Sequence, residues 1–406
     1  MQKQGINVFF LRRPVKLKED CALWVLALII FLSTNSVYFH LLPTIIVHAI
    51  KLSALLLPLV IKALLHRLTI EGKNTIVKLL ALGFFVFLLL PKAMISGNTF
   101  EFIGIFALHT LLMLLNIATL REHGILDLFD KYERITVTFA IISLFFWFFG
   151  EICHVIPNTG YVTTEWSGTV ANYFFLHFGA QSTRNCGVFV EAPMYNLALC
   201  TAIFFELFAK SQVNKFRLSV LIITNLTTLS TTGQLLLMAA LAFRFLALKK
   251  RKLSIFKLTI FSLVAVVVAG AAIYASKVIL VEKADGASFV VRAQYMLKEL
   301  HAFTTSPIVG HGFYSFSAGT SNSICLIMAE GGIIQLIIYT SCLVVLPIIV
   351  SKRSKDPRKK YFHLFFFLAF CITVSPYLLL TYAMMAVCAS SLLVSDNFYI
   401  KQYAED

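Results

Sequence analysis

The chain has 406 residues, of which 59% are hydrophobic and only 14% are charged, and its mean hydropathy is +0.83. Ordinary soluble domains do not reach this apolar content, so the composition excludes a soluble enzyme and indicates an integral membrane protein. The net charge of +15 would suit a nucleic-acid partner. The positions of the basic residues along the chain decide whether a nucleic-acid-binding protein remains an option.

Apolar runs long enough to cross about 30 Å of hydrocarbon as helices follow one another along the chain. They lie at residues 21–39, 42–62, 76–95, 100–120, 135–151, 187–209, 217–229, 232–248, 254–276, 323–350, 361–377 and 379–395. The pairs at 217–248 and 361–395 are short, which gives the count a margin of about two spans. The sequence therefore predicts an all-α integral membrane protein with about 12 transmembrane helices, as one polytopic domain over residues 1–406.

The basic residues separate by membrane side if the N-terminus is cytoplasmic and the spans alternate. In that case 28 of the 35 Lys and Arg residues fall on the cytoplasmic side, six fall outside, and Lys51 lies within a span. This asymmetry follows the positive-inside rule and accounts for the basic charge without nucleic acid. The clusters at 249–252 and 352–360 are interpreted as topology signals and anchors for anionic lipids. Both termini are expected in the cytoplasm.

The start of the chain and its cysteines carry two further patterns. A basic start and an apolar run resemble a signal peptide, but no small-residue cleavage site follows, which favours a retained helix. The eight cysteines show no metal-binding spacing. Cys153 and Cys186 share an outside segment and could form a disulfide, which spacing alone leaves open.

Two connecting segments, 151–186 and 277–322, are far longer than the others, and both are assigned to the outside face. Long loops in a compact helical protein usually carry function. In the second, six apolar residues recur at helical spacing: Phe289, Ala293, Met296, Leu297, Leu300 and Phe303. Arg292 and Glu299 share the opposite face, so we expect an amphipathic helix against the membrane surface or the bundle.

A polar, glycine-bearing strip follows that helix. Pro307 and Gly310 are expected to end the helix, and the sequence Gly-His-Gly at 310–312 permits tight backbone turns close to a ligand. The next span opens with Asn322 and carries Glu330 and paired glycines at 331 and 332. A close helix crossing that needs small residues would equally explain the glycines.

Four short motifs occur in a fixed order. They are R-x-x-G-x-F-x-E-x-P at 184–193, Ser-Thr-Thr-Gly at 230–233, Arg292 followed by S-P-x-x-G-x-G at 306–312, and Asn322 followed by Glu330 and Gly332. This order resembles the O-antigen ligase and polymerase superfamily of bacterial envelope-polysaccharide enzymes, which includes the Wzy-like polysaccharide polymerases. The resemblance covers roughly residues 180–345 and the overall topology.

The resemblance implies a multispanning, GT-C-like glycosyltransferase of the bacterial cytoplasmic (inner) membrane. It would transfer a growing glycan from a polyprenyl diphosphate carrier to a lipid-linked repeat unit at the outer face, in the synthesis of O-antigen, capsule or exopolysaccharide. Its implied partners are the lipid-linked oligosaccharide, membrane lipids, and the chain-length regulator and flippase of the same pathway, without nucleic acid. No cofactor is implied.

Two alternatives remain. The first is an O-antigen ligase, which passes the glycan to another acceptor; ligases typically carry a histidine where this chain has Ser321, which favours the polymerase. The second, from another class, is a lipid-linked oligosaccharide flippase or transporter. Such proteins tend to show internal repeats with broken helices in matching positions, and the sequence shows no such symmetry.

The chemistry of a diphosphate leaving group points to arginine, whose guanidinium binds phosphate oxygens with two prongs and stays charged. Arg184 and Arg292 are therefore the expected diphosphate-binding residues, and they make a metal unnecessary. Glu191 is a catalytic candidate, since seven residues would place it on nearly the same helical face as Arg184. The alternative for Arg184 and Glu191 is that they are interfacial helix-end charges, and for Arg292 that it lies on the solvated face of a surface helix.

His311 is the second catalytic candidate, as a proton acceptor with a suitable ordinary pKa, although a lone loop histidine is more often simply exposed. Gly310, Gly312 and Asn322 are expected to contact substrate more weakly. His48, His109 and Lys51 are interpreted as helix-packing residues, with snorkelling, pairing or a functional role as further options for the lysine.

Overall fold

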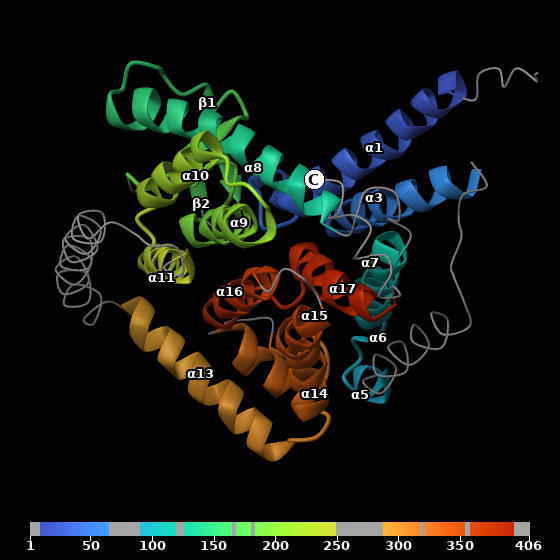
Figure 1. Cartoon of the computed structure of the whole chain (residues 1–406). Helices are drawn as coiled ribbons and strands as arrows, with labels where there is room; N and C mark the ends of the chain where they lie inside the picture. The colour runs from blue at the N-terminus through green and yellow to red at the C-terminus, as the bar shows by residue number, and fades with distance from the viewer. Residues whose placement is uncertain are drawn as a thin grey trace, which may run out of the picture.

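The structure is a computed structural model of the chain. It describes residues 9–64, 90–118, 126–164, 168–179, 183–248, 287–316, 320, 322–353 and 358–393. Helices dominate these residues (Figure 1). Five are long and apolar enough to cross a membrane: Thr44–Leu64, Thr99–Asn116, Asp127–Ile152, Ala192–Ala209 and Ser323–Ile349. The chain is therefore a mostly helical membrane protein.

The N-terminal part consists of α1 (Phe9–Leu32), α2 (Val37–His40), α3 (Thr44–Leu64), α5 (Leu90–Ile95), α6 (Thr99–Glu101), the π-helical η1 (Phe102–Leu108), α7 (His109–Ala118), α8 (Asp127–Phe146) and η2 (Trp147–Ile152). Three strands follow, β1 (Gly160–Thr164), β2 (Gly168–Tyr173) and β3 (His177–Gly179). The remainder comprises α9 (Ala192–Phe204), η3 (Phe205–Ala209), α10 (Lys215–Thr227), α11 (Thr231–Leu248), α13 (Ala287–Thr305), α14 (Ser323–Thr340), η4 (Ser341–Val345), α15 (Leu346–Arg353), α16 (Lys359–Ile372) and α17 (Leu379–Leu393).

Each expected span that falls on described residues contains a helix. Apolar runs in a membrane form helices because every backbone polar group must then be satisfied within the segment. The expected span at 254–276 and most of that at 76–95 lie outside the described residues. The total of about 12 spans therefore stays a prediction.

α9 lies at the centre of one part of the bundle, packed between α8, α10, α11 and α16 (Figure 1). Its residues are almost all buried, as expected for a helix that is apolar on every side. A second group forms around α7, which packs against α3 and α17, while α1 packs against α3 and α8.

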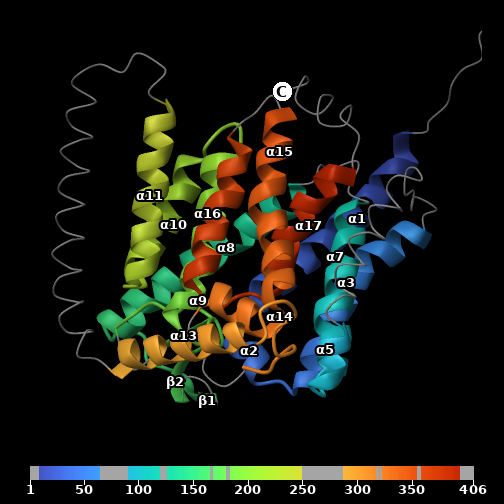
Figure 2. The same ribbon diagram turned by 90° about the horizontal axis from the view of Figure 1, so that it is seen from below.

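One end of the bundle holds α2, the sheet, the start of α14 and α13, which lies across the helix ends in Figure 2. We call this the loop end. In the topology expected from the basic residues it is the extracytoplasmic end.

The first long outside segment contains a sheet that the all-α prediction misses. β1, β2 and β3 form an antiparallel sheet in that order, with Gly160 opposite Asn172 and Tyr173 opposite His177. Alternating β-branched and aromatic residues favour strands here, and they outweigh the helical bias of the rest of the chain. Buried His177 hydrogen-bonds through Nε2 to Glu151 Oε1, which ties the sheet to the end of η2.

α13 is a helix, as the apolar spacing predicts, but the prediction of which side faces the bundle is wrong for Glu299. Glu299 is 1% exposed, whereas Leu297 is 64% exposed. The half of α13 that holds Glu299 lies against α14, and the half with exposed Arg292 extends beyond it (Figures 1 and 2). The neighbouring helix, and not the apolar moment of α13 alone, therefore sets its orientation.

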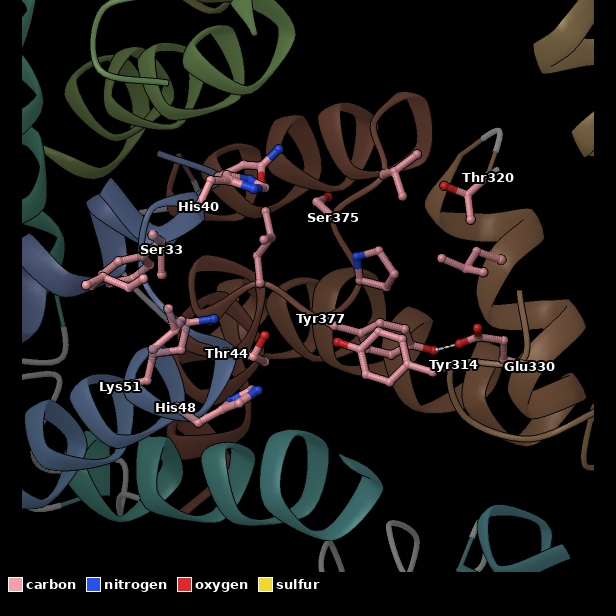
Figure 3. Close-up of a pocket in the computed structure, with 18 residues that line it drawn as sticks. Ser33, His40, Thr44, His48, Lys51, Tyr314, Thr320, Glu330, Ser375 and Tyr377 are labelled. Atoms are coloured by element: carbon pink, nitrogen blue, oxygen red, sulfur yellow. Dashed lines mark hydrogen bonds between the residues drawn. The ribbon is translucent and has the colours of Figure 1, made fainter. Parts of the chain in front are cut away.

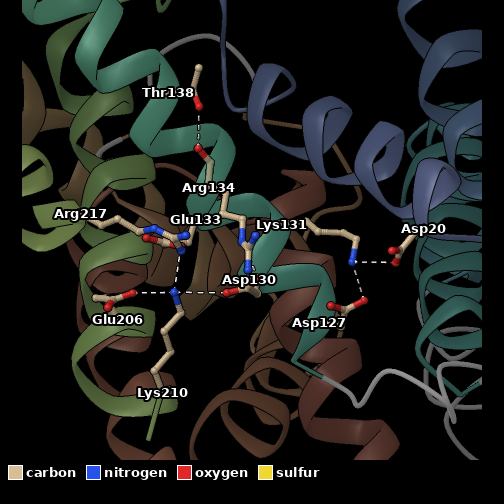
Figure 4. A network of polar contacts seen from close by, with 10 residues as sticks. All are labelled: Asp20, Asp127, Asp130, Lys131, Glu133, Arg134, Thr138, Glu206, Lys210 and Arg217. Atoms are coloured by element: carbon tan, nitrogen blue, oxygen red, sulfur yellow. Dashed lines mark hydrogen bonds and ion pairs between the residues drawn. The ribbon is translucent and has the colours of Figure 1, made fainter. Parts of the chain in front are cut away.

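At the other end of α9 from the loop end, a charge network joins α8, η3 and α10 (Figure 4). Lys210 Nζ forms ion pairs with Glu206 (2.7 Å), Glu133 (3.0 Å) and Asp130 (3.2 Å). Arg217 Nη1 also pairs with Glu133 (3.1 Å). Buried carboxylates are tolerated here because each has a cationic partner.

Cys153 and Cys186 are both free thiols, so the possible disulfide is not present. Cys153 is exposed and Cys186 is buried. Burial raises the pKa of the Cys186 thiol to about 12, so it is a neutral packing residue.

Candidate functional site

The first motif segment, 184–193, is held against the turn between α10 and α11. Arg184 donates from Nε to the carbonyl oxygen of Thr228 (3.1 Å). The backbone N–H of Asn185 donates to the carbonyl oxygen of Thr227 (3.0 Å), and Asn185 Nδ2 donates to Thr227 Oγ1 (3.0 Å). Arg184 is half-buried, and its Nη1 and Nη2 atoms make no hydrogen bond to the described residues. Among the described residues, its guanidinium is therefore anchored at one nitrogen only.

The second motif, at 230–233, packs against the first half of α9. A Cβ added at Gly233 would lie 1.8 Å from Asn196 Nδ2. Asn196 Nδ2 in turn donates to Thr228 Oγ1 (3.2 Å). The structure thus places the first two motifs beside each other, linked through Thr228 and Asn196, which flank them in the sequence.

Glu191 does not share a helical face with Arg184. Residues 184–191 are not helical, and Glu191 is the N-terminal cap of α9, with extended backbone angles of φ −152° and ψ 151°. Pro193 lies in the first turn, where proline is tolerated because that turn has no N–H partner to lose. The prediction is wrong because the helical period applies only inside a helix, and this helix begins at Ala192.

The third and fourth motifs are interlocked. α14 is interrupted at Gly332 (φ 60°, ψ −156°), and the segment after α13 lies against this break. The N–H of Ile333 donates to the carbonyl oxygen of Pro307 (2.8 Å), and the N–H of Gly312 donates to the carbonyl oxygen of Glu330 (2.9 Å). Backbone groups released by the break are thereby satisfied by a neighbouring segment.

Glycine is required on both sides of this contact. Gly310 has φ +65°, and a Cβ there would lie 2.3 Å from the carbonyl carbon of Glu330. A Cβ at Gly332 would lie 2.4 Å from the carbonyl oxygen of Ile308. Gly310 and Gly312 were expected to contact substrate; in the structure they allow the loop to approach α14.

Glu330, next to the break, is 2% exposed. The hydroxyl of Tyr377 donates to Glu330 Oε2, and the N–H of Phe316 donates to Oε1 (3.3 Å). Gln335 Nε2 donates to the Tyr377 hydroxyl (3.2 Å). Tyr377 and Phe316, from two segments that are distant in the sequence, thus hold the carboxylate in one orientation, and Gln335 holds the Tyr377 hydroxyl.

Beside Glu330 lies an open cavity of about 440 Å³ (Figure 3), within the size range of small-molecule sites. It is lined by residues 33–42 between α1 and α3, by α3 and α14, by Tyr314 and Thr320 after α13, and by residues 374–378 between α16 and α17. These segments are far apart in the sequence and meet at the loop end.

The side chains labelled in Figure 3 form two facing walls. One wall carries His40, His48 and Lys51, and we call it the α2–α3 wall. The facing wall carries Tyr314, Tyr377 and Glu330. Burial raises the pKa of Tyr314, and nearby carboxylates add to the effect, so this residue offers a neutral hydroxyl.

The α2–α3 wall was not expected from the sequence, where helix packing was the favoured role of His48 and Lys51. Both line the cavity, and His48 also stacks on His109 with ring centroids 6.0 Å apart. The signal that could have identified the wall is a lysine inside an apolar run, because an intramembrane charge is costly unless it serves a function.

Three predicted site residues lie elsewhere. His311 Nε2 hydrogen-bonds with Thr305 Oγ1 (2.8 Å) and the carbonyl oxygen of Ala302 (2.9 Å), and it is not among the cavity-lining residues. Asn322 caps α14 by accepting the N–H of Cys325 (2.9 Å). Arg292 is exposed on α13. Ser321 lies outside the described residues.

Comparisons with protein-family models, with curated proteins and with solved structures find no match for this chain. Within the described ranges, no group of three or more His, Cys, Asp or Glu side chains is placed to hold a metal ion. The candidate site is therefore the cavity itself, with Glu330 on one side and the α2–α3 wall on the other.

Proposed function

We propose that this chain is a glycosyltransferase of the bacterial cytoplasmic membrane, a polysaccharide polymerase that works at the extracytoplasmic face. It transfers a growing glycan from a polyprenyl diphosphate to a lipid-linked repeat unit. The observation that carries the proposal is the convergence of the four motifs at the loop end. The first two lie beside each other, and the last two are interlocked and hold Glu330 at a cavity of about 440 Å³.

Glu330 supports this function as the general base. In the transfer, the acceptor hydroxyl oxygen forms a bond to the anomeric carbon of the donor sugar, the bond from that carbon to the diphosphate oxygen breaks, and the diphosphate leaves with the electron pair. The hydroxyl proton passes to a carboxylate oxygen. Glu330 lines the cavity with its orientation fixed by Tyr377 and Phe316, whereas His311 hydrogen-bonds with the end of α13. Geometry therefore favours Glu330 for this role.

Arg184 supports the function as a diphosphate ligand. Its Nε is bound to the carbonyl oxygen of Thr228, which positions the guanidinium. Its two Nη atoms bond none of the described residues and are proposed to bind phosphate oxygens. Arg292 lies on the exposed part of α13, from which a movement of the helix would bring it to the substrate. Positive side chains stabilise the leaving group electrostatically in this scheme.

The proposal is tested in a strain that lacks the chromosomal copy. A polymerase deletion should lose long polysaccharide and retain single repeat units. Long lipid-linked chains that are not transferred would indicate the ligase, and repeat units held on the cytoplasmic side would indicate the flippase. Either result would overturn the proposal.

Complementation then tests the site. Glu330→Gln keeps the shape of the side chain and should abolish polymer, because an amide cannot accept the proton. Tyr377→Phe should shorten the polymer, whereas Tyr161→Phe, at a tyrosine that is 71% exposed on β1, should behave like the wild type. Normal polymer from Glu330→Gln, at matched expression, would exclude this carboxylate as the base.

A further inference from the structure

Lys51 has no carboxylate partner among the described residues. It lies seven residues after the start of α3, is half-buried, and lines the cavity. Its Nζ lies 5.8 Å from the centroid of the Phe39 ring, a cation–π contact, and it forms no ion pair in the described part of the chain. A cation inside a transmembrane segment is costly unless an anion compensates it. The compensating anion would therefore come from a ligand.

Two imidazoles stand on the same wall. His48 is three residues before Lys51 on α3, a spacing that places both on one helical face. His40 ends α2, where its Nε2 hydrogen-bonds with Asn35 Oδ1 (2.6 Å). The chain there is fixed by a backbone bridge between Ser36 and Phe189. The α2–α3 wall is thus a preformed group of nitrogen-bearing side chains.

The α2–α3 wall faces side chains that carry hydroxyl and carboxylate groups. Tyr314, Tyr377 and Glu330 lie across the cavity (Figure 3), and the Glu330 carboxylate is already bound by Tyr377 and Phe316. An anionic group of a ligand would therefore be attracted to the α2–α3 wall and repelled by the Glu330 side. This polarity orients a ligand that has a charged end and a neutral polar end.

α3 also offers a surface for an apolar chain. Outside the cavity it exposes several large apolar side chains in the described structure, namely Ile45, Ile46, Leu56, Leu57 and Val60. One helix thus combines a cation that lines the cavity with an apolar face suited to hydrocarbon. A lipid with a phosphorylated head fits both parts.

We propose that the α2–α3 wall binds the phosphate groups of a prenyl diphosphate carrier, with Lys51 as the main ligand and the prenyl chain along the exposed face of α3. This rests on the proposed function and extends it, since a polymerase handles two lipid diphosphates at once. Arg184 does not line this cavity, so the loop end holds two separate cationic positions, one for each carrier.

The test uses the full chain purified in detergent, with farnesyl diphosphate as the probe and binding measured by calorimetry. Lys51→Met should weaken binding at least about tenfold, whereas Lys51→Arg should retain most of it because the charge remains. Lys215→Met is the matched control, since Lys215 is exposed at the opposite end of α10 from the loop end and should bind as the wild type does. Thermal unfolding of each variant shows whether it is folded.

Competition by pyrophosphate and by farnesol, the two parts of farnesyl diphosphate, identifies what the α2–α3 wall recognises. Weak competition by pyrophosphate and none by farnesol would support a lipid diphosphate site. Pyrophosphate that competes as well as farnesyl diphosphate would assign the wall to free diphosphate, and farnesol that competes equally well would show that phosphate is not recognised; each would overturn the proposal. Wild-type affinity in folded Lys51→Met would also overturn it.

The proposed function and this site can fail separately. If Lys51→Met binds farnesyl diphosphate as the wild type does, but Glu330→Gln loses its polymer, only the phosphate site is excluded and the polymerase function stands. If purified Lys51→Met binds farnesyl diphosphate more weakly, but the deletion strain still makes long polysaccharide, the phosphate site stands and the polymerase function is excluded.

Discussion

Substituting Gly332 with alanine perturbs the contact between α14 and the loop after α13. The glycine has φ +60°, where side chains are strained, and an added Cβ would lie 2.4 Å from the carbonyl oxygen of Ile308 and 2.7 Å from that of Pro307. Both neighbours are backbone atoms that cannot rotate away. The loop must therefore withdraw from α14.

The cost can be worked from the structure. The unfavourable backbone conformation contributes about 1–3 kcal/mol. Withdrawal also removes the hydrogen bonds from the N–H of Ile333 to Pro307 (2.8 Å) and from the N–H of Ile334 to Ile308 (3.4 Å), at about 0.5–1.5 kcal/mol each. The expected destabilisation is thus about 2–6 kcal/mol in total.

Gly97→Ala is the matched control. Gly97 also has a positive φ, +79°, but nothing lies within 4 Å of an added Cβ, so only the strain of about 1–3 kcal/mol remains. Thermal unfolding of the purified variants should show a clearly lower midpoint for Gly332→Ala, and its polymer should be lost because Glu330 and Phe316 are no longer held together. Equal midpoints for the two variants would refute the close approach of loop and helix.

Three further predictions concern charge. Lys210→Met should lower the midpoint of thermal unfolding, because it leaves buried carboxylates without their shared cation, which costs about 3–5 kcal/mol of stability. The exposed control Lys215→Met should keep the wild-type midpoint. Equal midpoints for the two variants would show that the charge network does not stabilise the fold. Arg184→Ala should cost about 2–4 kcal/mol of transition-state stabilisation. Arg184→Lys should also be impaired, because lysine lacks the two-pronged guanidinium. Normal polymer from both Arg184→Ala and Arg292→Ala would show that neither arginine takes part in the reaction. Reporters fused after residues 165 and 300 should be extracytoplasmic and those after 252 and 356 cytoplasmic, and a cytoplasmic signal from both long segments would invert the topology.

The secondary structure of the spans could be predicted because hydropathy is a local property. A run such as 42–62 forms a helix wherever it sits in the bundle, since the bilayer leaves its backbone no other partner, and α3 covers Thr44–Leu64. The sheet at 160–179 was missed because its strands are short and stabilised by pairing with one another, which hydropathy does not report.

The candidate site could be predicted only in part. The motifs included Arg184 and Glu330, but the sequence assigned the catalytic role to Glu191 and His311 and not to Glu330. The helical period misplaced Glu191, because Pro193 and the cap start α9 later than the apolar run suggests. Orientation of side chains across a helix depends on neighbours, as buried Glu299 on α13 shows.

What the sequence by itself determined is the class of protein, its helical spans and the expected membrane sides, because these depend on the apolar content and charge of consecutive residues. Only the tertiary structure decided that Lys51 lines the same cavity as Glu330 and Tyr377. Lys51 lies hundreds of positions before the other two in the sequence, and their meeting depends on how α3, α14 and the turn before α17 pack. Packing between distant segments is a property of the whole folded chain, which no local pattern encodes.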